Sequence, residues 1–216
     1  MASWRRSPGK LTPDSPVIAY RQTDRRWPAL WTGAGDRVQA SARWHARGEG
    51  DEHLAQYLSL HPLGAWAELV RYQGIRAEAQ LDEVRRRLWR LVVWPRGVAE
   101  LSTFDAIAAC GLDPAGFVSD DYDRARALAD ELRAAGFTGL ASPSAALPGV
   151  VNLTLFGSRF PFEDWGFHSP RLPDDVIPAS VAADAARPEP GLLAHVRHYG
   201  DAHAGYETWR AGCEPR

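Results

Sequence analysis

A small set of residues lies where strands or loops are expected to end, without an obvious role in a helix cap or in the core. It consists of Arg21, Arg43, Tyr57, Glu68 and Ser144. Guanidinium groups are planar, forked and permanently charged, which suits them to phosphate or carboxylate ligands. A helical carboxylate beside vacant volume suits solvent or a ligand, and a serine between two prolines suits a turn. Taken singly, each residue has an ordinary structural explanation, such as a surface ion pair, and spacing alone leaves the function open.

Two strands and a long loop are expected to position the first of these residues. Apolar residues predict a strand over 17–21, which ends at Arg21, and a short strand over 57–60. Between them, residues 32–50 are rich in Gly and Arg and lack sustained apolar periodicity, which is typical of a long loop. Because long loops in compact domains are commonly functional, the loop position of Arg43 suits contact with a ligand.

A helix with one buried face is expected to carry Glu68. The dipeptide His61–Pro62 sets its start, and its apolar residues recur at positions i, i+3, i+4 and i+7, namely Leu63, Trp66, Ala67 and Val70. At about 100° per residue, Glu68 points away from this apolar stripe. The residues one turn before it, Gly64 and Ala65, are small and predict open space above the carboxylate.

The sequence as far as residue 160 completes an α+β pattern. It contains no internal repeat and no linker that demands two independent domains. The further expected elements are a helix and then a strand within 79–94, a short helix over 103–109, a helix that follows Asp120–Asp121, buries Ala125, Leu128, Ala129 and Leu132 and ends before Gly136, and strands over 137–142 and 150–156.

The two ends of the chain differ from this region in composition. Residues 1–16 are polar and contain Pro, Ser and Gly, as expected of a flexible leader. Beyond Arg159 the chain is rich in proline, and one or two short helices are expected within 191–210. We therefore expect one α+β domain over 17–160 and a C-terminal extension over 161–216 packed on the same domain.

The charge of the chain excludes some classes of partner. Lys and Arg number 25 and Asp and Glu 27, so the formal net charge is −2. No global positive field exists to hold nucleic acid or an anionic membrane directly, and any phosphate binding must be local. The longest apolar runs fall short of the ~20 residues of a membrane-spanning helix, and the N-terminus lacks an apolar signal core. We expect a cytoplasmic protein without membrane contact.

The cysteines and histidines do not form a metal-binding pattern. Cys110 and Cys213 are far apart, with no CxxC or Cys/His cluster, which argues against a zinc site or a disulfide framework. His195, His198 and His203 have no carboxylate or cysteine at ligand spacing, and solvated or helix-terminal histidines are the commoner explanation. No metal is expected.

Several short motifs follow one another in a characteristic order. They are Tyr20-Arg21, Gly33-Ala34-Gly35, Ala42-Arg43-Trp44 with Gly48, Tyr57-Leu58-Ser59, Ala65-Trp66-Ala67-Glu68, Pro143-Ser144-Ala145 and Asn152-Leu153. In this order and spacing, the sequence resembles the RES domain family over roughly residues 17–160. That family takes its name from an arginine, a glutamate and a serine, which here match Arg21, Glu68 and Ser144.

The resemblance implies a fold, an activity and a partner. Members are similar in fold to ADP-ribosyltransferase toxins, which implies a mixed β-sheet core with flanking helices. They are typically toxins of bacterial toxin–antitoxin pairs that degrade NAD+ by phosphorolysis or hydrolysis, so NAD+ is the expected substrate, with phosphate or water as acceptor and no other cofactor. Their antitoxin is usually an Xre-type helix-turn-helix protein, which supplies the DNA contact. A hetero-oligomer with this antitoxin or a homodimer is expected.

The resemblance also assigns roles to residues. Breaking the bond from nicotinamide to ribose generates positive charge on the sugar, which a carboxylate such as Glu68 stabilises. Arg21 and Arg43 would bind the pyrophosphate, because a guanidinium fork meets two phosphate oxygens at once. Tyr57 would stack on nicotinamide or orient Glu68. The expected catalytic residues are Glu68, Arg21 and Ser144, and the expected NAD+-binding residues are Arg21, Arg43, Tyr57, Ser144 and Asn152.

Two alternative functions stay open. The same fold could transfer ADP-ribose to a protein side chain, because the acceptor is decided by loop geometry. A non-catalytic nucleotide-binding module is the alternative of another class. Its support is the loop with Ala42 and His45, where the family usually has glycine and asparagine. The joint presence of Arg21, Glu68 and Ser144 speaks against it.

Overall fold

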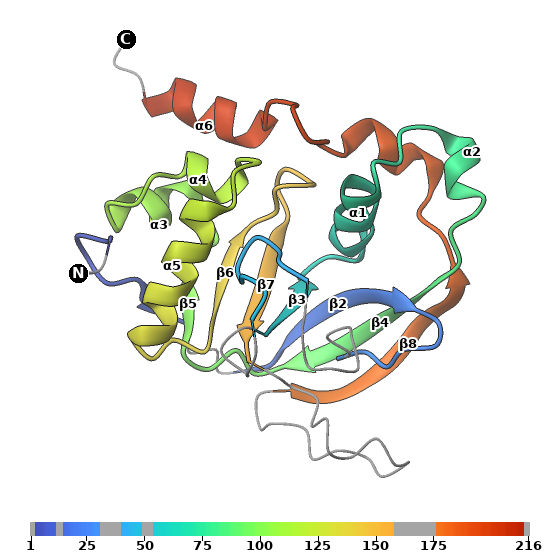
Figure 1. Ribbon diagram of the computed structural model, residues 1–216, viewed down its shortest axis with the longest axis horizontal. Coiled ribbons are helices and arrows are strands. Elements are labelled where there is room, and N and C mark those ends of the chain that lie inside the picture. The colour runs from blue at the N-terminus through green and yellow to red at the C-terminus, as the bar shows by residue number, and fades with distance from the viewer. Residues whose placement is uncertain (1–2, 12–14, 31–39, 49–53, 158–175, 214–216) are drawn as a thin grey trace.

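The part of the chain that the structure describes forms one mixed β-sheet flanked by helices (Figure 1). The computed structural model describes residues 3–11, 15–30, 40–48, 54–157 and 176–213. Its strands are β1 (Gly9–Lys10), β2 (Val17–Asp24), β3 (Ala55–Ser59), β4 (Arg86–Val93), β5 (Val98–Glu100), β6 (Gly139–Pro143), β7 (Val151–Phe156) and β8 (Val176–Ala186). Within the described part they pair in the order β1-β5-β6-β7-β3-β2-β4-β8, with β5 and β6 parallel and the other neighbours antiparallel.

The helices cover the two halves of the sheet separately. They are α1 (Pro62–Gln73), α2 (Glu78–Leu81), α3 (Phe104–Ala109), α4 (Ala115–Val118), α5 (Asp123–Ala134), the 3-10 helix η3 (Pro190–His195) and α6 (Ala204–Cys213). In Figure 1, α3, α4 and α5 gather beside β5 and β6, whereas α1 lies beside β3 and β2. The expected α+β fold, with a mixed sheet and flanking helices, is confirmed.

The sheet divides between β2 and β3. β2 pairs with β4 along all eight of its residues, and β3 pairs with β7 along all five of its own. Between β2 and β3, in contrast, the register contains a single pair, Tyr20 with Ser59. The two strands separate beyond this pair, so residues that follow Tyr20 and precede Ser59 face a gap in the sheet.

The helices pack in two separate buried clusters, while a third cluster joins strands from both halves of the sheet. On one side, the α5 residues Leu128 and Leu132 pack with Ile107 of α3. On the other side, Trp66 and Val70 of α1 pack in a cluster that also includes residues of β4 and η3. Because α1 has a separate core, its position depends on β4 and on the C-terminal segment.

Most of the expected elements are confirmed. The helix after Asp121 buries the four expected apolar residues and ends before Gly136, whose φ of 79° suits glycine. An N-cap at Asp120–Asp121 was expected from the sequence, but the N-cap is Tyr122, whose side chain makes no capping hydrogen bond. Asp121, one residue earlier, accepts a hydrogen bond from the backbone N–H of Asp123 at 3.0 Å, and the carboxylate of Asp120 binds Arg71.

Several elements differ from the expectation, and β1, β5 and α4 were not predicted from the sequence. β2 continues past Arg21 to Asp24, since its ladder with β4 continues to that residue. The expected helix within 79–94 is the four-residue α2, and most of the remaining apolar residues belong to β4. β8 was not expected, because five of its eleven residues are alanine and it contains Pro178, which are poor strand signals. Its backbone pairing with β4 determines its conformation.

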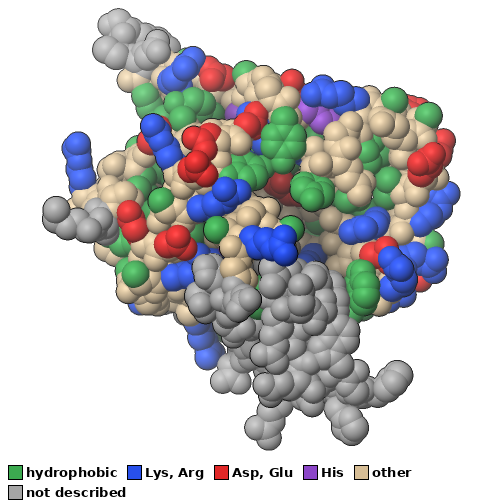
Figure 2. Space-filling view, viewed as in Figure 1, with side chains coloured by type: hydrophobic (Ala, Val, Ile, Leu, Met, Phe, Trp, Pro, Cys, Tyr) green, Lys and Arg blue, Asp and Glu red, His purple; other side chains and the backbone are tan. Residues whose placement is uncertain are grey.

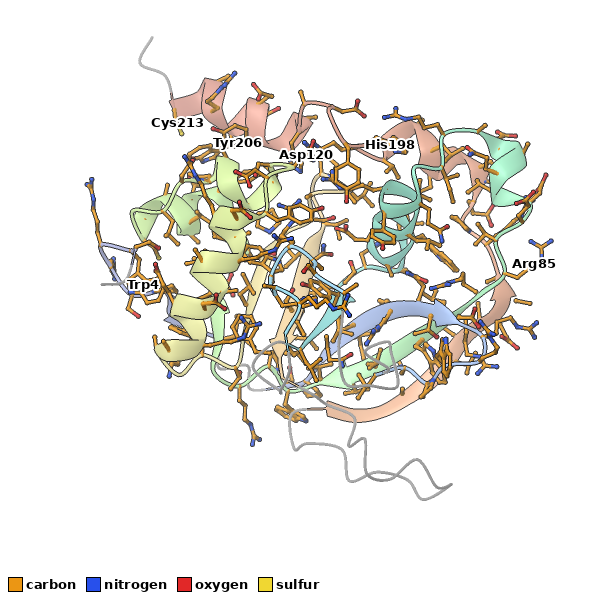
Figure 3. All side chains as sticks on the ribbon, viewed as in Figure 1. Trp4, Arg85, Asp120, His198, Tyr206 and Cys213 are labelled. Carbon is orange, nitrogen blue, oxygen red and sulfur yellow. The ribbon has the colours of Figure 1, made fainter. Side chains whose placement is uncertain are left out.

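The segments beyond the domain core also make ordered contacts. β1 pairs with β5, and the backbone N–H of Arg5 donates to the carbonyl of Cys110. Figure 3 shows Tyr206 reaching from α6 toward α3, where it contacts the ring of Phe104 edge-on. Both cysteines are free thiols, with Cys110 buried and Cys213 exposed. No helix in the described ranges has the length and apolar character needed to cross a membrane.

Candidate active site

A cavity of about 670 Å³ opens where β2 and β3 separate. This volume lies within the range of roughly 300–1,000 Å³ that small-molecule sites occupy. Figure 2 shows hydrophobic side chains and Lys or Arg side chains around the hollowed middle of this face. The cavity brings together most of the residues that the sequence singled out, which are Arg21, Arg43, Tyr57, Glu68 and Asn152.

Helix α1 presents Glu68 to this cavity. The side chain of His61 caps the helix by accepting a hydrogen bond from the backbone N–H of Leu63 at 3.2 Å. The expectation that Gly64 leaves open space beside Glu68 was wrong, because a Cβ at this position would overlap Ser59 and Val150. Its lack of a side chain lets α1 approach the sheet closely, while Ala65 lines the cavity.

The buried face of α1 matches the sequence pattern except at its start. Trp66, Ala67 and Val70 are buried as expected. Leu63 was expected on the same face but is 40% exposed. The reason is its place in the first turn, where it lines a second, shallower depression together with residues of the loop that precedes β7.

Two side chains hold the carboxylate of Glu68 in place. The hydroxyl of Ser144 donates to Glu68 Oε1 at 2.9 Å, and Nδ2 of Asn152 donates to the same oxygen at 2.7 Å. Ser144 comes from the turn after β6 and Asn152 from β7, two strands that pair with each other. Because both donors meet Oε1, the carboxylate is fixed through one oxygen while the residue lines the cavity.

Ser144 lies behind Glu68 rather than at the cavity surface. It is 1% exposed, and its hydroxyl oxygen also accepts hydrogen bonds from the backbone N–H groups of Ala146 and Leu147, at 3.2 and 3.1 Å. Its carbonyl accepts a hydrogen bond from Nε2 of His203 at 3.0 Å. The geometry therefore places Ser144 in contact with Glu68 and keeps its hydroxyl away from the cavity.

Arg21 of β2 and Arg86 of β4 line the part of the cavity that these two strands form, which we call the strand wall. Nη1 of Arg21 donates to the side-chain oxygen of Gln56, and Gln56 is held in turn by the carbonyl of Leu30 at 2.9 Å. Burial, with a smaller contribution from the positive charge of Arg86, lowers the pKa of the Arg21 guanidinium to about 10. The guanidinium groups of Arg21 and Arg86 thus lie close together on this wall and remain charged at neutral pH.

Arg43 also lines the cavity, beside the loop that precedes α5. Its guanidinium stacks over the ring of Tyr122 at 4.5 Å. Nη1 of Arg43 is buried and has no hydrogen-bond partner among the described residues. Burial lowers the pKa of this guanidinium, while Tyr122 and the negative charge of Glu68 act in the opposite direction. Arg43 is therefore close enough to Glu68 to interact with it electrostatically.

Tyr57 fixes the loop that carries Arg43. Its hydroxyl accepts a hydrogen bond from the backbone N–H of Trp44 at 3.0 Å and lies 2.8 Å from Nδ1 of His45. Nε2 of His45 faces the carbonyl of Ala40 at 2.7 Å and must donate there, so we assign the Tyr57 hydroxyl as donor to Nδ1. The hydroxyl is thereby used in shaping the loop, and its described partners do not include Glu68.

The two departures from the family pattern fit this loop. Ala42 makes a backbone hydrogen bond to the carbonyl of His45 at 3.0 Å, and its φ is not positive, so no glycine is required there. His45 is buried and holds Tyr57 through its ring. Of the predicted loop over 32–50, residues 32–39, 49 and 50 lie outside the described residues.

Comparison with known proteins identifies the family of this chain. The model of the RES domain matches residues 18–176, most of the chain. The chain belongs to the RES domain family. A probable NAD(+) phosphorylase of Mycobacterium tuberculosis is 34% identical over 130 residues, which are 60% of this chain and 60% of that protein. The chain thus matches about three fifths of the length of this curated relative.

A solved structure supports the fold of this RES domain. The crystal structure of the M. tuberculosis MbcT–MbcA toxin–antitoxin complex contains a chain that superposes with a TM-score of 0.57. The match covers 86% of this chain and 90% of that one, at 21% sequence identity. At this identity the likeness establishes the shared fold.

The cavity of this RES domain also contains residues that the sequence did not single out. They are Arg71, Arg86, Tyr122 and Tyr199. Arg71 stands three residues after Glu68 and therefore on the same face of α1, a helical spacing that could have indicated it. Tyr122 and Tyr199 come from loops far apart in the sequence, and their hydroxyls lie 2.8 Å from each other. No sequence pattern links these two tyrosines.

Arg71 anchors a second hydrogen-bonded cluster beside the cavity. It is 2% exposed, its Nη2 donates to Asp120 at 2.7 Å, and its Nη1 donates to the carbonyl of Ala145 at 3.1 Å. Asp120 also accepts hydrogen bonds from Arg197 at 2.9 Å and from the backbone N–H of Gly200 at 2.7 Å. Figure 3 shows Asp120 facing the C-terminal segment that carries His198. This cluster joins α1, the loop before α5 and the C-terminal segment.

The histidines near the C-terminus lie among backbone and side-chain groups of the fold rather than in a metal site. Nε2 of His203 donates to Ser144, and its Nδ1 accepts a hydrogen bond from the backbone N–H of Tyr206, which caps the start of α6. His195 is exposed and ends η3, so the expectation of a solvated or helix-terminal position holds for His195 and His203, whereas His198 is buried away from a helix end. The described residues contain no group of three His, Cys, Asp or Glu that could hold a metal ion.

Proposed function

We propose that this chain cleaves the bond between nicotinamide and ribose in NAD+ and acts as the toxin of a toxin–antitoxin pair. The observation that carries this proposal is the carboxylate of Glu68, held by Ser144 and Asn152 at the surface of a cavity with arginines on two sides. The similarity to a probable NAD(+) phosphorylase and the family membership support it.

The carboxylate suits the chemistry of this bond. As the bond to nicotinamide breaks, positive charge develops on the ribose, and a fixed anion nearby stabilises that charge more in the transition state than in the ground state. Glu68 is pre-positioned for this role because two hydrogen bonds hold Oε1 before any substrate arrives. Nicotinamide leaves as a neutral molecule and needs no proton. Glu68 is thus the proposed catalytic residue, and Ser144 and Asn152 position it.

The arginines of the cavity suit the anionic part of the substrate. The pyrophosphate of NAD+ needs cationic groups, and Arg21 with Arg86 offers two on the strand wall. Tyr57 presents an aromatic ring to the cavity while its hydroxyl is engaged with the loop, which leaves stacking on nicotinamide as its proposed contact. Arg43, beside Tyr122, offers a further cationic contact for an anion.

The acceptor and the partner complete the proposal. The name of the M. tuberculosis relative favours inorganic phosphate over water as acceptor. The structural neighbour comes from a toxin–antitoxin complex, which supports an antitoxin partner, and the family suggests an Xre-type protein in the cytoplasm. A cytoplasmic site gives access to the NAD+ pool that such a toxin would deplete. No observation on the cavity favours transfer of ADP-ribose to a protein.

The decisive experiment follows nicotinamide release by the purified chain. With NAD+ and phosphate present, the parent should release nicotinamide, and Glu68→Gln should lower the rate by roughly 10²–10³-fold, because a neutral amide cannot stabilise the developing cation. Binding of NAD+ to the variant, measured by calorimetry, should persist.

Glu83→Gln, the same change at an exposed position of the loop before β4, is the matched control and should keep the parent rate. Equal turnover by parent and Glu68→Gln would remove Glu68 from the catalytic role. Absence of nicotinamide release by the parent would overturn the proposed activity itself.

A further inference from the structure

Arg43 has a buried donor that no described residue satisfies. Its Nη1 has no hydrogen-bond partner among the described residues, and the residue lines the cavity. Leaving a buried N–H without a partner costs free energy, more so for a charged group. The guanidinium is held rigidly nonetheless, because it stacks over Tyr122 at 4.5 Å and its loop is tied to Tyr57. A donor that is fixed and unsatisfied points to an acceptor supplied by a ligand.

The charge around Arg43 favours an anionic ligand. Arg71 and Arg197 add positive charge around Arg43, and Glu68 adds a negative charge. Three guanidinium groups, with the carboxylates of Glu68 and Asp120, give this part of the cavity a net positive charge. Arg71 and Arg197 both donate hydrogen bonds to Asp120. Nη1 of Arg43 has no such acceptor among the described residues, so it is the donor that an anion would meet.

Arg43 and Arg21 contact different parts of the cavity lining. The guanidinium of Arg43 stacks over the ring of Tyr122, whereas Nη1 of Arg21 donates to the side chain of Gln56 in β3. The two arginines are therefore held by different segments around one cavity. Phosphorolysis of a dinucleotide needs two anion sites, one for the pyrophosphate and one for the attacking phosphate, and the second must lie beside the carboxylate that faces the anomeric carbon.

We propose that Arg43, on the side of the cavity formed by Tyr122, binds the inorganic phosphate that attacks the ribose, while Arg21 on the strand wall binds the pyrophosphate of NAD+. This inference rests on the proposed function and specifies its acceptor. Arg43 supplies Nη1 to a phosphate oxygen and holds the ion next to Glu68. The guanidinium offsets the repulsion between the phosphate and that carboxylate.

The reaction at this site balances without further reagents. An oxygen of HPO₄²⁻ donates an electron pair to the anomeric carbon and forms a C–O bond. The C–N bond to nicotinamide breaks, and its electron pair goes to the pyridinium nitrogen, which becomes neutral. The products are nicotinamide and ADP-ribose 1″-phosphate, which retains the proton of the phosphate. No oxidant, metal or proton donor is consumed.

The experiment compares Arg43→Gln with Arg21→Gln in the full chain. For each, the KM for phosphate is measured at saturating NAD+ and the KM for NAD+ at saturating phosphate. Arg43→Gln should raise the KM for phosphate roughly tenfold to 100-fold, as expected on loss of a hydrogen bond to a charged group, and the KM for NAD+ by much less. Arg21→Gln should do the reverse. In Arg43→Gln the products should shift from ADP-ribose 1″-phosphate toward ADP-ribose.

Two further measurements exclude a merely structural effect. Arg43→Lys keeps the charge and should recover part of the affinity for phosphate. Inorganic phosphate, without NAD+, should raise the Tm of the parent but not that of Arg43→Gln, because a ligand that binds the folded state stabilises it.

The outcomes separate this inference from the proposed function. A KM for NAD+ that rises in Arg43→Gln while the KM for phosphate stays at the parent value would place Arg43 on the dinucleotide and overturn the inference. NAD+ cleavage whose rate and products do not depend on phosphate would overturn it too, yet leave the proposed activity standing. If the parent does not cleave NAD+, the proposed function fails, and the Tm shift with phosphate alone decides whether Arg43 forms an anion site.

Discussion

Glu68 and Arg71 are three residues apart on α1, and each lies at the centre of a hydrogen-bonded cluster. The Glu68 cluster is open, because both donors, from Ser144 and Asn152, meet Oε1 and the residue lines the cavity. The Arg71 cluster is closed, because Arg71 is 2% exposed and Asp120 receives hydrogen bonds on both of its oxygens. The Glu68 cluster presents a charged group to the cavity, whereas the charged groups of the Arg71 cluster bind one another and the backbone.

The difference shows how one helix presents a charged side chain to a cavity and uses another to hold distant segments. Arg71 is buried whereas the side chain of Asp120 is 32% exposed, so loss of Arg71 removes hydrogen bonds from several segments at once. The Arg71 cluster therefore holds the C-terminal segment and the loop before α5 against α1, and with them Tyr199 and Tyr122 at the cavity. The Arg71 cluster also supports the Glu68 cluster, because Arg71 binds the carbonyl of Ala145, the residue that follows Ser144.

The largest effect is expected from breaking the closed cluster. Arg71→Met should lower the free energy of unfolding by about 3 kcal/mol, because three acceptors, the carbonyl groups of Ala145 and Arg197 and the carboxylate of Asp120, lose a hydrogen bond from a buried charged donor. Urea unfolding of parent and variant measures this. Arg124→Met is the matched control, since Arg124 and Asp113 form an exposed pair, and it should change stability by less than about 0.5 kcal/mol. Equal losses in both variants would show that the cluster around Arg71 does not hold the fold.

A smaller effect, on catalysis rather than stability, is expected in the open cluster. Asn152→Ala removes one of two donors to Glu68 Oε1 and should lower kcat roughly tenfold to 100-fold, with little change in the KM for NAD+. Thr154→Val is the control, because Thr154 lies two residues further along β7 and its hydroxyl is buried without a partner in the described residues. A kcat that falls equally in both variants would contradict a positioning role for Asn152.

The smallest effect is expected from the second arginine of the closed cluster. Arg197→Gln should lower the free energy of unfolding by about 1 kcal/mol, because Asp120 keeps its hydrogen bonds from Arg71 and Gly200. The same urea series measures it beside Arg71→Met. If Arg197→Gln lowers the free energy of unfolding as much as Arg71→Met does, Arg197 rather than Arg71 is the main donor that stabilises the cluster.

Local patterns were sufficient to predict much of the chain. The helix that carries Glu68 and the helix over 123–134 follow from apolar spacing and from end signals such as His61 and Gly136. Such signals act within a few residues and can be read from the sequence. β8 could not be predicted in this way, because its alanines and its proline are not typical of a strand and its pairing partner β4 lies some 90 residues earlier in the sequence.

The candidate site divides in the same way. The order of the motifs indicated Arg21, Arg43, Tyr57, Glu68 and Asn152, and these residues do line one cavity. Their orientation did not follow from that order. Ser144 lies behind Glu68, the hydroxyl of Tyr57 binds its own loop, and Gly64 serves packing against Ser59 rather than open space. Each of these depends on contacts between segments distant in sequence.

By itself, the sequence determined that this chain forms an α+β domain with the arginine, glutamate and serine of the RES family in a recognisable order. It determined this through short-range periodicity and motif spacing, which need no knowledge of distant neighbours. The tertiary structure alone decided that β2 and β3 separate after a single pair, and that Arg71, Tyr122 and Tyr199 join the cavity. The physical reason is that strand pairing, burial of charge and unsatisfied donors are properties of contacts, which exist only once distant segments meet.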